Sequence, residues 1–332
     1  MTFKICTIGC GSLATSQHGP AFVKYATSHP QTELTACCDL VEERARSYKE
    51  KFGFRRYYTD NVEMLNREKP DAVCLIAPVD LTCELSCQIL QMGYPLLVEK
   101  PPGRTPEELG RMIAAAESTG AITQVSFNRR YAPLIREIKS LLAGQLADRP
   151  IQYLRYDFYR YNRMDADFST TAIHGIDAVR FLTGCDYERI QFHYQQFPEL
   201  GYQVANIFMD CKMTSGAVAH LNFCPIAGVT IERATINALD HTFFLDTPIW
   251  GEFDSPGKIL HFQNNQLKLE LSGDELPEGT ETFELSGFYG ENAAFFDDLR
   301  AGRRPACDLK DARQSVEIAH CIRERKDAYI RS

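Results

Sequence analysis

The chain has 332 residues, 44% of them hydrophobic and 24% charged, so it is long enough for two domains and too apolar for a disordered protein. Its formal net charge of -8 argues against nucleic acid as a main partner, because the basic residues form no stripe and are scattered among acids. The expected ligand is therefore a small molecule.

The first residues and the cysteines indicate the compartment. The start, MTFKICTIGCG, lacks the pattern of a secretory signal, and no later run reaches the roughly 18 apolar residues of a membrane span. The 12 cysteines are scattered, several of them in strand-like runs such as ACCD, which favours reduced and buried thiols. There is no CxxC pair and no HxxxH spacing. We therefore expect a cytoplasmic protein with no membrane partner and no bound metal.

Residues 1–125 alternate short apolar runs with helical patterns, as a parallel sheet with crossover helices requires. The expected strands are KICTIG (4–9), ELTACCD (33–39), DAVCLIA (71–77), PLLVEK (95–100) and ITQVSF (122–127). Asp60 with Glu63, and Thr105 with Glu108, form capping boxes that mark two helix starts between these strands. The pattern predicts an α/β domain over residues 1–125.

From about Ile151 the pattern changes to longer alternating runs rich in Tyr, Phe and β-branched residues, which are typical of a mostly antiparallel sheet. These runs are IQYLRYDFYRY (151–161), RIQFHYQQF (189–197), YQVANIFMDCK (202–212), AVAHLNF (217–223) and VTIERATINAL (229–239). One helix is expected near 171–183, and two more near 290–301 and 309–327. We therefore expect a second, α+β domain over residues 126–332, with a large open sheet.

The segment ICTIGCGSLA places Gly9, Gly11 and Ala14 in a GxGxxA pattern directly after the first strand. Helix N-terminal amides hold a pyrophosphate in such a turn, and the small residues permit the turn and a close approach of the ligand. Asp39, at the end of the second strand, is suited to bind an adenosine ribose. The spacing from Gly11 to Asp39 is longer than usual, and Pro20 interrupts a long first helix. A glycine turn beside a surface aspartate is the alternative interpretation.

The segment LLVEKPPG places Glu99 and Lys100 at the carboxyl end of the predicted fifth strand, the edge where open α/β sheets bind ligands. A lysine at this edge is able to stabilise a developing alkoxide. Taken alone, a solvated lysine before a proline turn is the more ordinary interpretation.

The segment STTAIHGID places His174 and Asp177 three residues apart on a predicted helix, where they share one face. An imidazole, with an unperturbed pKa of about 6.5, accepts and returns a proton near neutral pH. Such a pair also occurs in ordinary cores, so the wider pattern has to decide.

Together these segments resemble the Gfo/Idh/MocA family, named after glucose-fructose oxidoreductase and inositol dehydrogenase, over nearly the whole chain. The resemblance is carried by IGCGSLA, HGPAF, CDL followed by Arg44, LVEKPPG, VSFNRRYAP, AIHGID with RFLTG, and GFYGENAAFFDDLRAGRRP. It implies an N-terminal Rossmann domain with a nicotinamide cofactor, and a C-terminal domain whose open sheet carries substrate and often packs against another subunit. It also implies that Lys100 and His174 are catalytic and flank the hydroxyl that is oxidised.

The same resemblance implies a cofactor site. The expected cofactor-binding residues are Gly9, Cys10, Gly11, Ser12, Leu13, Asp39, Arg44, Ala77, Pro78, Glu99, Lys100, Asn128 and Arg129. Asp39 favours NAD, because its carboxylate would repel a 2'-phosphate. Arg44 and Arg46 nearby keep NADP as an alternative. Arg130 is expected to be structural.

The expected substrate-binding residues are Lys100, Tyr161, Asn162, Arg163, Thr170 and His174. For residues 161–163, a solvated sheet edge is the alternative interpretation. Arg163 matters most if the substrate carries a carboxylate or a phosphate, because guanidinium matches those groups.

Two positions depart from the family pattern. The family usually has an aspartate where this chain has Thr170, and often a histidine where it has Thr82. Loss of the acid removes a group that would orient substrate or raise the basicity of His174. Asp177 is then expected to support His174 and not to act as a base.

Three functions fit these observations. The leading hypothesis is an NAD(P)-dependent oxidoreductase that transfers hydride from a secondary hydroxyl of a sugar, sugar derivative or cyclitol. The second is redox-neutral glycoside cleavage, in which tightly bound NAD oxidises the sugar transiently. The third is a cofactor-binding sugar sensor without turnover, against which the retained Lys100 and His174 count. The expected assembly is a homodimer or homotetramer formed through the C-terminal sheet.

Overall fold

The computed structural model describes residues 2–146, 150–165 and 167–331, with the backbone alone for Gln145. The chain divides into two compact units, Met1–Asn128 with Gly287–Val316, and Arg129–Ser286 with Glu317–Ser332. The first boundary lies close to the expected one at residue 125. The expected division differs in one respect, since residues 287–316 return to the first unit. Residues 1 and 332, the ends of the expected domains, lie outside the described residues.

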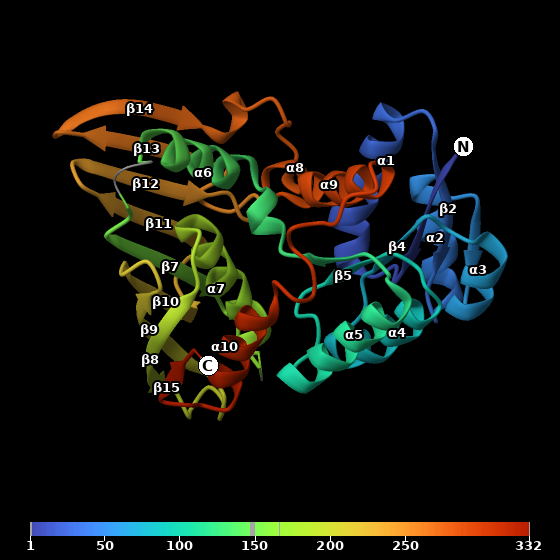
Figure 1. Ribbon diagram of the computed structural model, residues 1–332, viewed down its shortest axis with the longest axis horizontal. Helices are drawn as coiled ribbons and strands as arrows, with labels where there is room; N and C mark the ends of the chain where they lie inside the picture. The colour runs from blue at the N-terminus through green and yellow to red at the C-terminus, as the bar shows by residue number, and fades with distance from the viewer. Residues whose placement is uncertain (1, 147–149, 166, 332) are drawn as a thin grey trace. The chain divides into compact units, whose positions relative to one another are not determined.

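The first unit is built on a parallel sheet (Figure 1). Its strands are β1 (Phe3–Ile8), β2 (Thr32–Cys38), β3 (Arg56–Tyr58), β4 (Ala72–Leu75), β5 (Leu96–Glu99) and β6 (Thr123–Ser126). Its helices are η1 (Ala14–His18), α1 (Gly19–Ser28), α2 (Glu42–Phe52), α3 (Asn61–Glu68), α4 (Val79–Gln91), α5 (Pro106–Thr119) and α9 (Phe288–Arg300). The strand order β3-β2-β1-β4-β5-β6, parallel throughout, confirms the expected Rossmann arrangement.

Burial explains why these strands form a parallel sheet. Every residue of β4, β5 and β6 is buried, as in a sheet that is covered on both faces. Helices α4 and α5 pack side by side, and α1 packs against α9. Asp60 and Thr105 both cap helix starts as expected: Asp60 accepts the amide proton of Glu63, and Thr105 accepts that of Glu108. The structure shows only this half of each expected capping box, since Glu108 accepts from the amide of Arg104 instead. In the described residues, no helix is both long and apolar enough to cross a bilayer.

The second unit is built on a large mixed sheet. Its strands are β7 (Tyr153–Tyr161), β8 (Tyr187–Gln196), β9 (Ala205–Met213), β10 (Val218–Ala227), β11 (Ile231–Ala238), β12 (His241–Thr247), β13 (Lys258–Gln263), β14 (Gln266–Ser272) and β15 (Ala328–Ile330). Its helices are α6 (Pro133–Gln145), α7 (Ser169–Thr183), η3 (Gly273–Glu275) and α8 (Thr282–Leu285), while η2 (Asn128–Tyr131) and α10 (Arg313–Arg323) each contain a boundary between the units.

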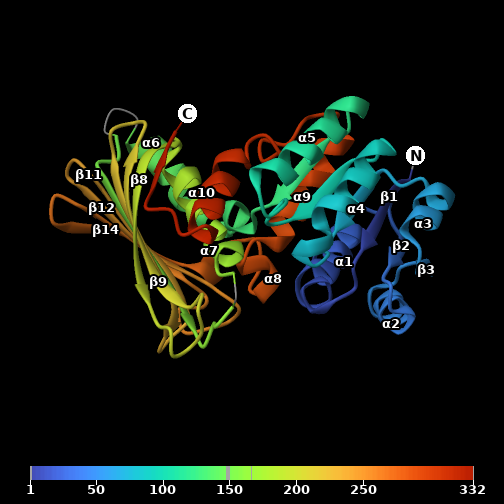
Figure 2. The ribbon, with the colours of Figure 1, turned by 90° about the horizontal axis from the view of Figure 1, so that it is seen from below.

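The strand order is β14-β13-β12-β11-β7-β10-β9-β8-β15, and within it only β7 and β10 pair in parallel. This confirms the expected, mostly antiparallel sheet. Helices α6 and α7 lie on one face of it, and in the part of the chain that the structure describes no helix covers the other face (Figure 2).

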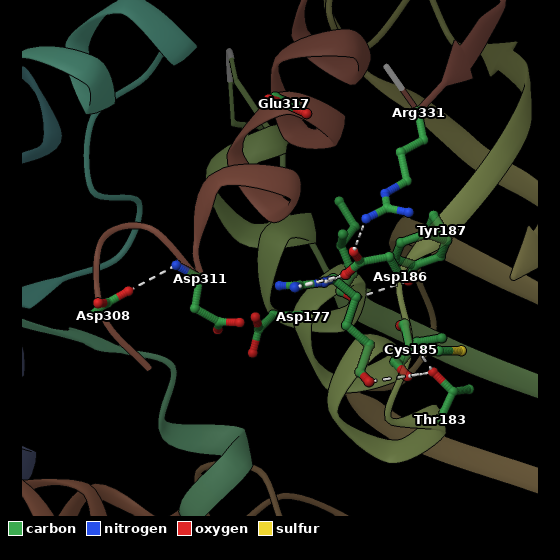
Figure 3. Close-up of polar contacts among 12 residues, drawn as sticks. Asp177, Thr183, Cys185, Asp186, Tyr187, Asp308, Asp311, Glu317 and Arg331 are labelled. Atoms are coloured by element: carbon green, nitrogen blue, oxygen red, sulfur yellow. Dashed lines mark hydrogen bonds and ion pairs between the residues drawn. The ribbon is translucent and has the colours of Figure 1, made fainter. Parts of the chain in front are cut away.

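Ion pairs fix the end of α7 to the C-terminal segment (Figure 3). Asp186, three residues after the end of α7, accepts hydrogen bonds from Arg180 Nε at 3.1 Å and Nη2 at 2.9 Å, and it pairs with Arg331 at 3.0 Å. The Tyr187 hydroxyl donates to the carbonyl of Ile176 at 2.9 Å. These contacts hold the helix that carries His174 in a fixed place on the sheet.

Candidate active site

The glycine turn after β1 is closed by Asp39. Gly9 has φ +96°, and a Cβ there would lie 2.0 Å from the carbonyl oxygen of Ile76. A Cβ on Gly11 would meet nothing within 4 Å, so the turn is open on that side. The amide of Cys10 donates to Asp39 Oδ2 at 2.9 Å. The turn therefore offers the open backbone cradle that a dinucleotide phosphate needs.

The neighbouring expected cofactor residues lie at the same edge of the sheet. Ser12 is exposed and Leu13 is half-buried, both directly before η1. Ala77 and Pro78 follow β4, and Arg44 is exposed on α2. The carboxyl ends of β1, β2, β4 and β5 thus bring this set together within the first unit, since the four strands are parallel.

Pro20 sets the start of α1. One π-helical turn precedes α1. Pro20 lies in the first turn of α1, where a residue without an amide proton is tolerated. The break expected from this proline is absent, because residues 12–28 are helical without a gap and both His18 and Gly19 keep right-handed helical dihedrals. The wider π-helical turn accommodates the proline, and it places the fully buried His18 directly before α1.

Gly9→Ala tests the turn, and Gly53→Ala is its matched control. Both glycines have positive φ, but a Cβ on Gly53 meets nothing within 4 Å. We expect Gly53→Ala to lower the free energy of unfolding by about 1–2 kcal/mol from backbone strain alone. Gly9→Ala adds a backbone clash and should cost about 2–5 kcal/mol. Urea unfolding measures both, and equal losses would contradict the close approach to Ile76.

Glu99 is buried at the end of β5, directly before the half-buried Lys100. His18 Nε2 lies 2.9 Å from Glu99 Oε1, and the Ser126 hydroxyl donates to the same oxygen at 2.8 Å. Burial alone would raise the pKa of Glu99, but the hydrogen bond and charge of His18 and the charge of Lys100 hold this pKa below its ordinary value. Glu99 is therefore an anion beside Lys100.

His18, Glu99 and Glu291 have ligand-type atoms within 4.8 Å of one another, which is the composition of a small metal site. Hydrogen bonds already join these groups through His18 Nε2 and Ser126 Oγ. The geometry therefore favours shared protons over a metal ion among these residues.

Thr82, the position at which the resemblance leads us to expect a histidine, lies on α4. Its side chain is 2% exposed, and its hydroxyl donates to the carbonyl of Pro78 at 3.2 Å. The threonine is thus turned toward its own helix start. Near it, Asp80 pairs with Arg104.

In the second unit, His174 is buried in α7, and 7% of it is exposed. The next residue, Gly175, lets the helix approach the sheet closely. A Cβ there would lie 2.8 Å from the ring of Phe223 and 3.3 Å from that of Phe158. Packing of this helix on β7 and β10 therefore fixes the position of His174.

Asp177 forms an ion pair with Arg130. Its two oxygens accept from Arg130 Nε at 2.7 Å and Nη2 at 2.6 Å, and the aspartate is 1% exposed. This agrees with a structural role for Arg130. Support of His174 by Asp177 stays a prediction.

Two of the expected substrate residues lie near the start of α7. Arg163 Nε donates to Asp165 at 2.9 Å, and Arg163 Nη2 donates to Thr171 at 3.3 Å. The Thr170 hydroxyl donates to the carbonyl of Asp167 at 3.0 Å. Thr170 precedes His174 by one helical turn, so both lie on one face of α7.

Tyr161 and Asn162 have a different placement. Tyr161 is 67% exposed at the end of β7. By strand alternation it points away from the face on which the buried Phe158 packs against Gly175. Asn162 turns the chain with φ +49°. Arg163 and Thr170 thus lie at the start of α7, while Tyr161 points away from the face of the sheet on which this helix packs.

Arg129 is bound to a buried carboxylate of the second unit. Glu232 on β11 is fully buried, and Arg129 contacts its oxygens at 2.7 and 3.2 Å. Arg160 pairs with the same carboxylate, and the Tyr156 hydroxyl donates to it at 3.0 Å. Burial opposes ionisation, but the two arginines outweigh it and lower the pKa of Glu232 to about 2. The expected neighbour Asn128 lies in the first unit.

Glu232→Gln should destabilise the protein by about 3–5 kcal/mol at pH 7, because two buried guanidinium groups lose their shared anion. The folded pKa of about 2 is lower than the unfolded value of about 4.3, so this stabilisation is complete above pH 4.3 and is lost as the pH falls toward 2. Urea unfolding at pH 7 and between pH 5 and 3 should therefore show a gap between wild type and variant that narrows with acid.

Glu188→Gln is the matched control for this variant. Glu188 also lies on a strand of the second unit and pairs with Lys212 at 3.0 Å, but its side chain is 47% exposed. Its loss should cost less than about 1 kcal/mol. Equal effects of the two substitutions would contradict the buried ion cluster.

The sequence comparisons with known proteins find their family match in the N-terminal part of the chain. Residues 3–127 match the GFO_IDH_MocA model, described as an oxidoreductase family with an NAD-binding Rossmann fold. The chain is 30% identical over 129 residues to D-glucoside 3-dehydrogenase of Escherichia coli K12, covering 39% of this chain and 36% of that protein. It is 25% identical to scyllo-inositol 2-dehydrogenase (NAD(+)) of Bacillus subtilis, covering 50% of this chain and 51% of that protein. The matches thus span about a third to a half of these relatives.

Agreement in fold extends over the whole chain. A crystal structure of a Gfo/Idh/MocA family oxidoreductase from Vibrio cholerae superposes with a TM-score of 0.81 at 21% identity, covering 98% of each chain. At this identity the likeness shows the fold alone.

Ser126 and Glu291 were not among the expected site residues. Both lie in segments that carried the family resemblance, VSFNRRYAP and GFYGEN, but neither segment alone indicates that the two side chains meet. Their hydrogen bond joins residues 165 positions apart.

Proposed function

Because residues 3–127 belong to the NAD-binding Gfo/Idh/MocA oxidoreductase family, we propose that the protein is an NAD(P)-dependent dehydrogenase of a secondary hydroxyl on a sugar, sugar derivative or cyclitol. The observation that carries this proposal is the place of Lys100, at the carboxyl end of β5 in the NAD-binding unit and beside the anionic Glu99. Two similar proteins are named for oxidation of a glucoside and of an inositol.

In the proposed reaction, bound NAD supplies the hydride acceptor. The imidazole of His174 accepts the proton of the substrate hydroxyl. The ammonium of Lys100 stabilises the negative charge that develops on the same oxygen. The buried position of His174 on α7 keeps its ring in one orientation, because the adjacent Gly175 packs directly on the sheet.

Within this proposal, the cofactor is NAD in preference to NADP. Asp39 ends β2 and is held in place by the amides of Cys10 and Val41, each at 2.9 Å. A carboxylate fixed there accepts hydrogen bonds from a ribose and repels a 2'-phosphate. The exposed Arg44 is the group that would favour NADP.

A panel of sugars, cyclitols and glycosides tested with NAD and NADP examines the proposal. We expect at least one sugar or cyclitol to give net NADH, measured by absorbance of the reduced nicotinamide, with NAD used better than NADP. Binding of sugar and NAD without turnover of any substrate would favour a sensor over an enzyme.

Redox-neutral glycoside cleavage is the second candidate. The observation that favours it is Thr170, which occupies a position where the family usually has an aspartate. The Thr170 hydroxyl donates to the backbone carbonyl of Asp167. An altered acid-base set next to His174 is consistent with altered chemistry. Release of aglycone without net NADH, by protein purified with NAD bound, would identify this activity.

We also propose that copies of the chain associate through the uncovered face of the nine-stranded sheet. Large apolar side chains are exposed there, including Tyr161 and, on β12, Phe244, which is 42% exposed. Light scattering should show a homodimer or homotetramer. A monomer at micromolar concentration would contradict this assembly.

A further inference from the structure

A buried chain of hydrogen bonds runs behind Lys100 inside the first unit. It joins His18 of η1, Glu99 of β5, Ser126 of β6 and Glu291 of α9. None of the four is more than 6% exposed, and His18 and Glu291 are fully buried. The four side chains thus come together from separate segments and are shielded from solvent.

The His18 ring is held on its other edge as well. Asn292 Nδ2 lies 3.2 Å from His18 Nδ1, and the same nitrogen donates to the carbonyl of Phe288 at 2.6 Å. The ring of Phe288 packs edge-on against the imidazole, with 5.1 Å between centroids. Helix α9 therefore fixes the ring so that Nε2 points at Glu99.

The distances around Ser126 require an extra proton. Its Oγ lies 2.8 Å from Glu99 Oε1 and 2.6 Å from Glu291 Oε1. A hydroxyl carries one proton and donates it to one acceptor, so the other contact needs a proton from a carboxyl group. Two ionised carboxylates would leave one of these short oxygen contacts repulsive.

Glu291 is the better holder of that proton. Glu99 already accepts hydrogen bonds from His18 Nε2 and from Ser126, and it lies next to the positive charge of Lys100. Each of these favours its anionic form. Glu291 then donates to Ser126, and Ser126 donates to Glu99.

We propose that His18, Ser126 and Glu291 are positioning residues that hold Glu99 as the single anion of this cluster, with the shared proton on Glu291. The Glu99 carboxylate then keeps Lys100 charged and fixed at the end of β5. This rests on the proposed function, in which Lys100 stabilises the reacting oxygen.

Infrared difference spectra test the location of the proton without any turnover. The wild type should show the carbonyl stretch of a buried protonated carboxyl group, which Glu291→Gln removes and Glu99→Gln retains. Loss of the band in Glu99→Gln with retention in Glu291→Gln would overturn the assignment, as would absence of the band from the wild type.

Kinetics test the effect on Lys100. Gln at position 291 is neutral and keeps an N–H donor for Ser126, so we expect kcat/KM to stay within about threefold of wild type. Gln at position 99 removes the anion and should lower kcat/KM by about tenfold or more. Equal losses in the two variants would overturn the proposal.

The pH profile separates positioning from simple loss of structure. Without the Glu99 anion Lys100 loses a neighbouring negative charge, so the alkaline limb of kcat should move to lower pH. The groups that face Glu99 are His18 and Glu291, with the Cys74 thiol of β4 close to Glu291. None of these is changed in Glu99→Gln, and an unmoved limb would overturn the proposal.

Ser126→Ala has a matched control in Ser86→Ala. Both serines are buried in the first unit, and the Ser86 hydroxyl has no hydrogen-bond partner among the described residues. We expect a loss of about tenfold in kcat/KM for Ser126→Ala and none for Ser86→Ala. The comparison of Ser126→Ala with Ser86→Ala still tests the proposal if the Glu99→Gln variant does not fold. If Lys100→Met retains full activity, the proposed function fails, while the infrared result still decides where the proton lies.

Discussion

Replacement of His174 by Asn is expected to lower kcat/KM by about 10²- to 10⁴-fold, the usual contribution of a general acid-base group. Asparagine is polar and of similar size, so it fills the space on α7 but takes no proton near neutral pH. The fall should appear in kcat with the best substrate of the panel. The acidic limb of the pH profile should vanish with it, because that limb reports protonation of the base.

His220→Asn is the matched control for this variant. His220 lies on β10 of the same unit and pairs with Asp210 at 2.7 Å, but its side chain is 40% exposed. The control should keep full activity, and both variants should bind NAD as the wild type does. A loss of less than about tenfold in His174→Asn would remove His174 from the proposed reaction.

The first sheet could be predicted from sequence because its strands are buried on both faces. β4 and β5 are continuous apolar runs bounded by turn residues, which is the strongest local signal of a parallel strand. β3 has only three residues, RYY, and none is buried, so it has no such signal. The expected runs also leave out the four later strands β12, β13, β14 and β15. β14 is an edge strand without a buried residue, so its sequence has no core-facing pattern.

The return of residues 287–316 to the first unit could not be seen in the sequence. Phe295 and Phe296 of α9 are fully buried and pack with Phe22 and Tyr25 of α1. An amphipathic helix shows that it has a buried face but not what covers that face. The helix was therefore expected, near 290–301, while its partner was not.

The candidate site, like the fold, was predictable only where a local sequence pattern determines the structure. Gly9, Gly11 and Asp39 follow a local fingerprint, in which each residue type meets a backbone requirement of the turn. The cluster behind Lys100 has no local fingerprint, because His18 and Glu99 are 81 positions apart. Buried polar groups of this kind are fixed by tertiary partners, which one sequence does not show.

Replacement of Lys100 by Met should lower kcat/KM by about 10²- to 10³-fold, the usual loss when one preorganised group that stabilises an oxyanion is removed. Methionine retains most of the apolar stem and lacks the ammonium. Because the charge acts on the oxygen as it becomes negative, the loss should fall on kcat more than on the KM for substrate.

The controls for Lys100→Met separate charge from structure. Lys139→Met removes a lysine whose Nζ donates to the carbonyl of Leu182 in the second unit, and it should leave kcat unchanged. Lys100→Arg keeps the positive charge on a larger, planar group and should recover only part of the activity. A Lys100→Met variant that binds NAD less tightly but turns over at the wild-type kcat would show that Lys100 holds the cofactor and takes no part in the chemistry.

Combining the two substitutions gives the sharpest test of a shared oxygen. If Lys100 and His174 act on the same hydroxyl, the double variant loses less than the product of the two single losses, since each group depends on the other being present. Independent roles would instead give multiplied losses. If the two losses in transition-state stabilisation simply add in the double variant, the proposed pairing is contradicted. This holds even if each single substitution lowers the activity enough to show that its residue is catalytic.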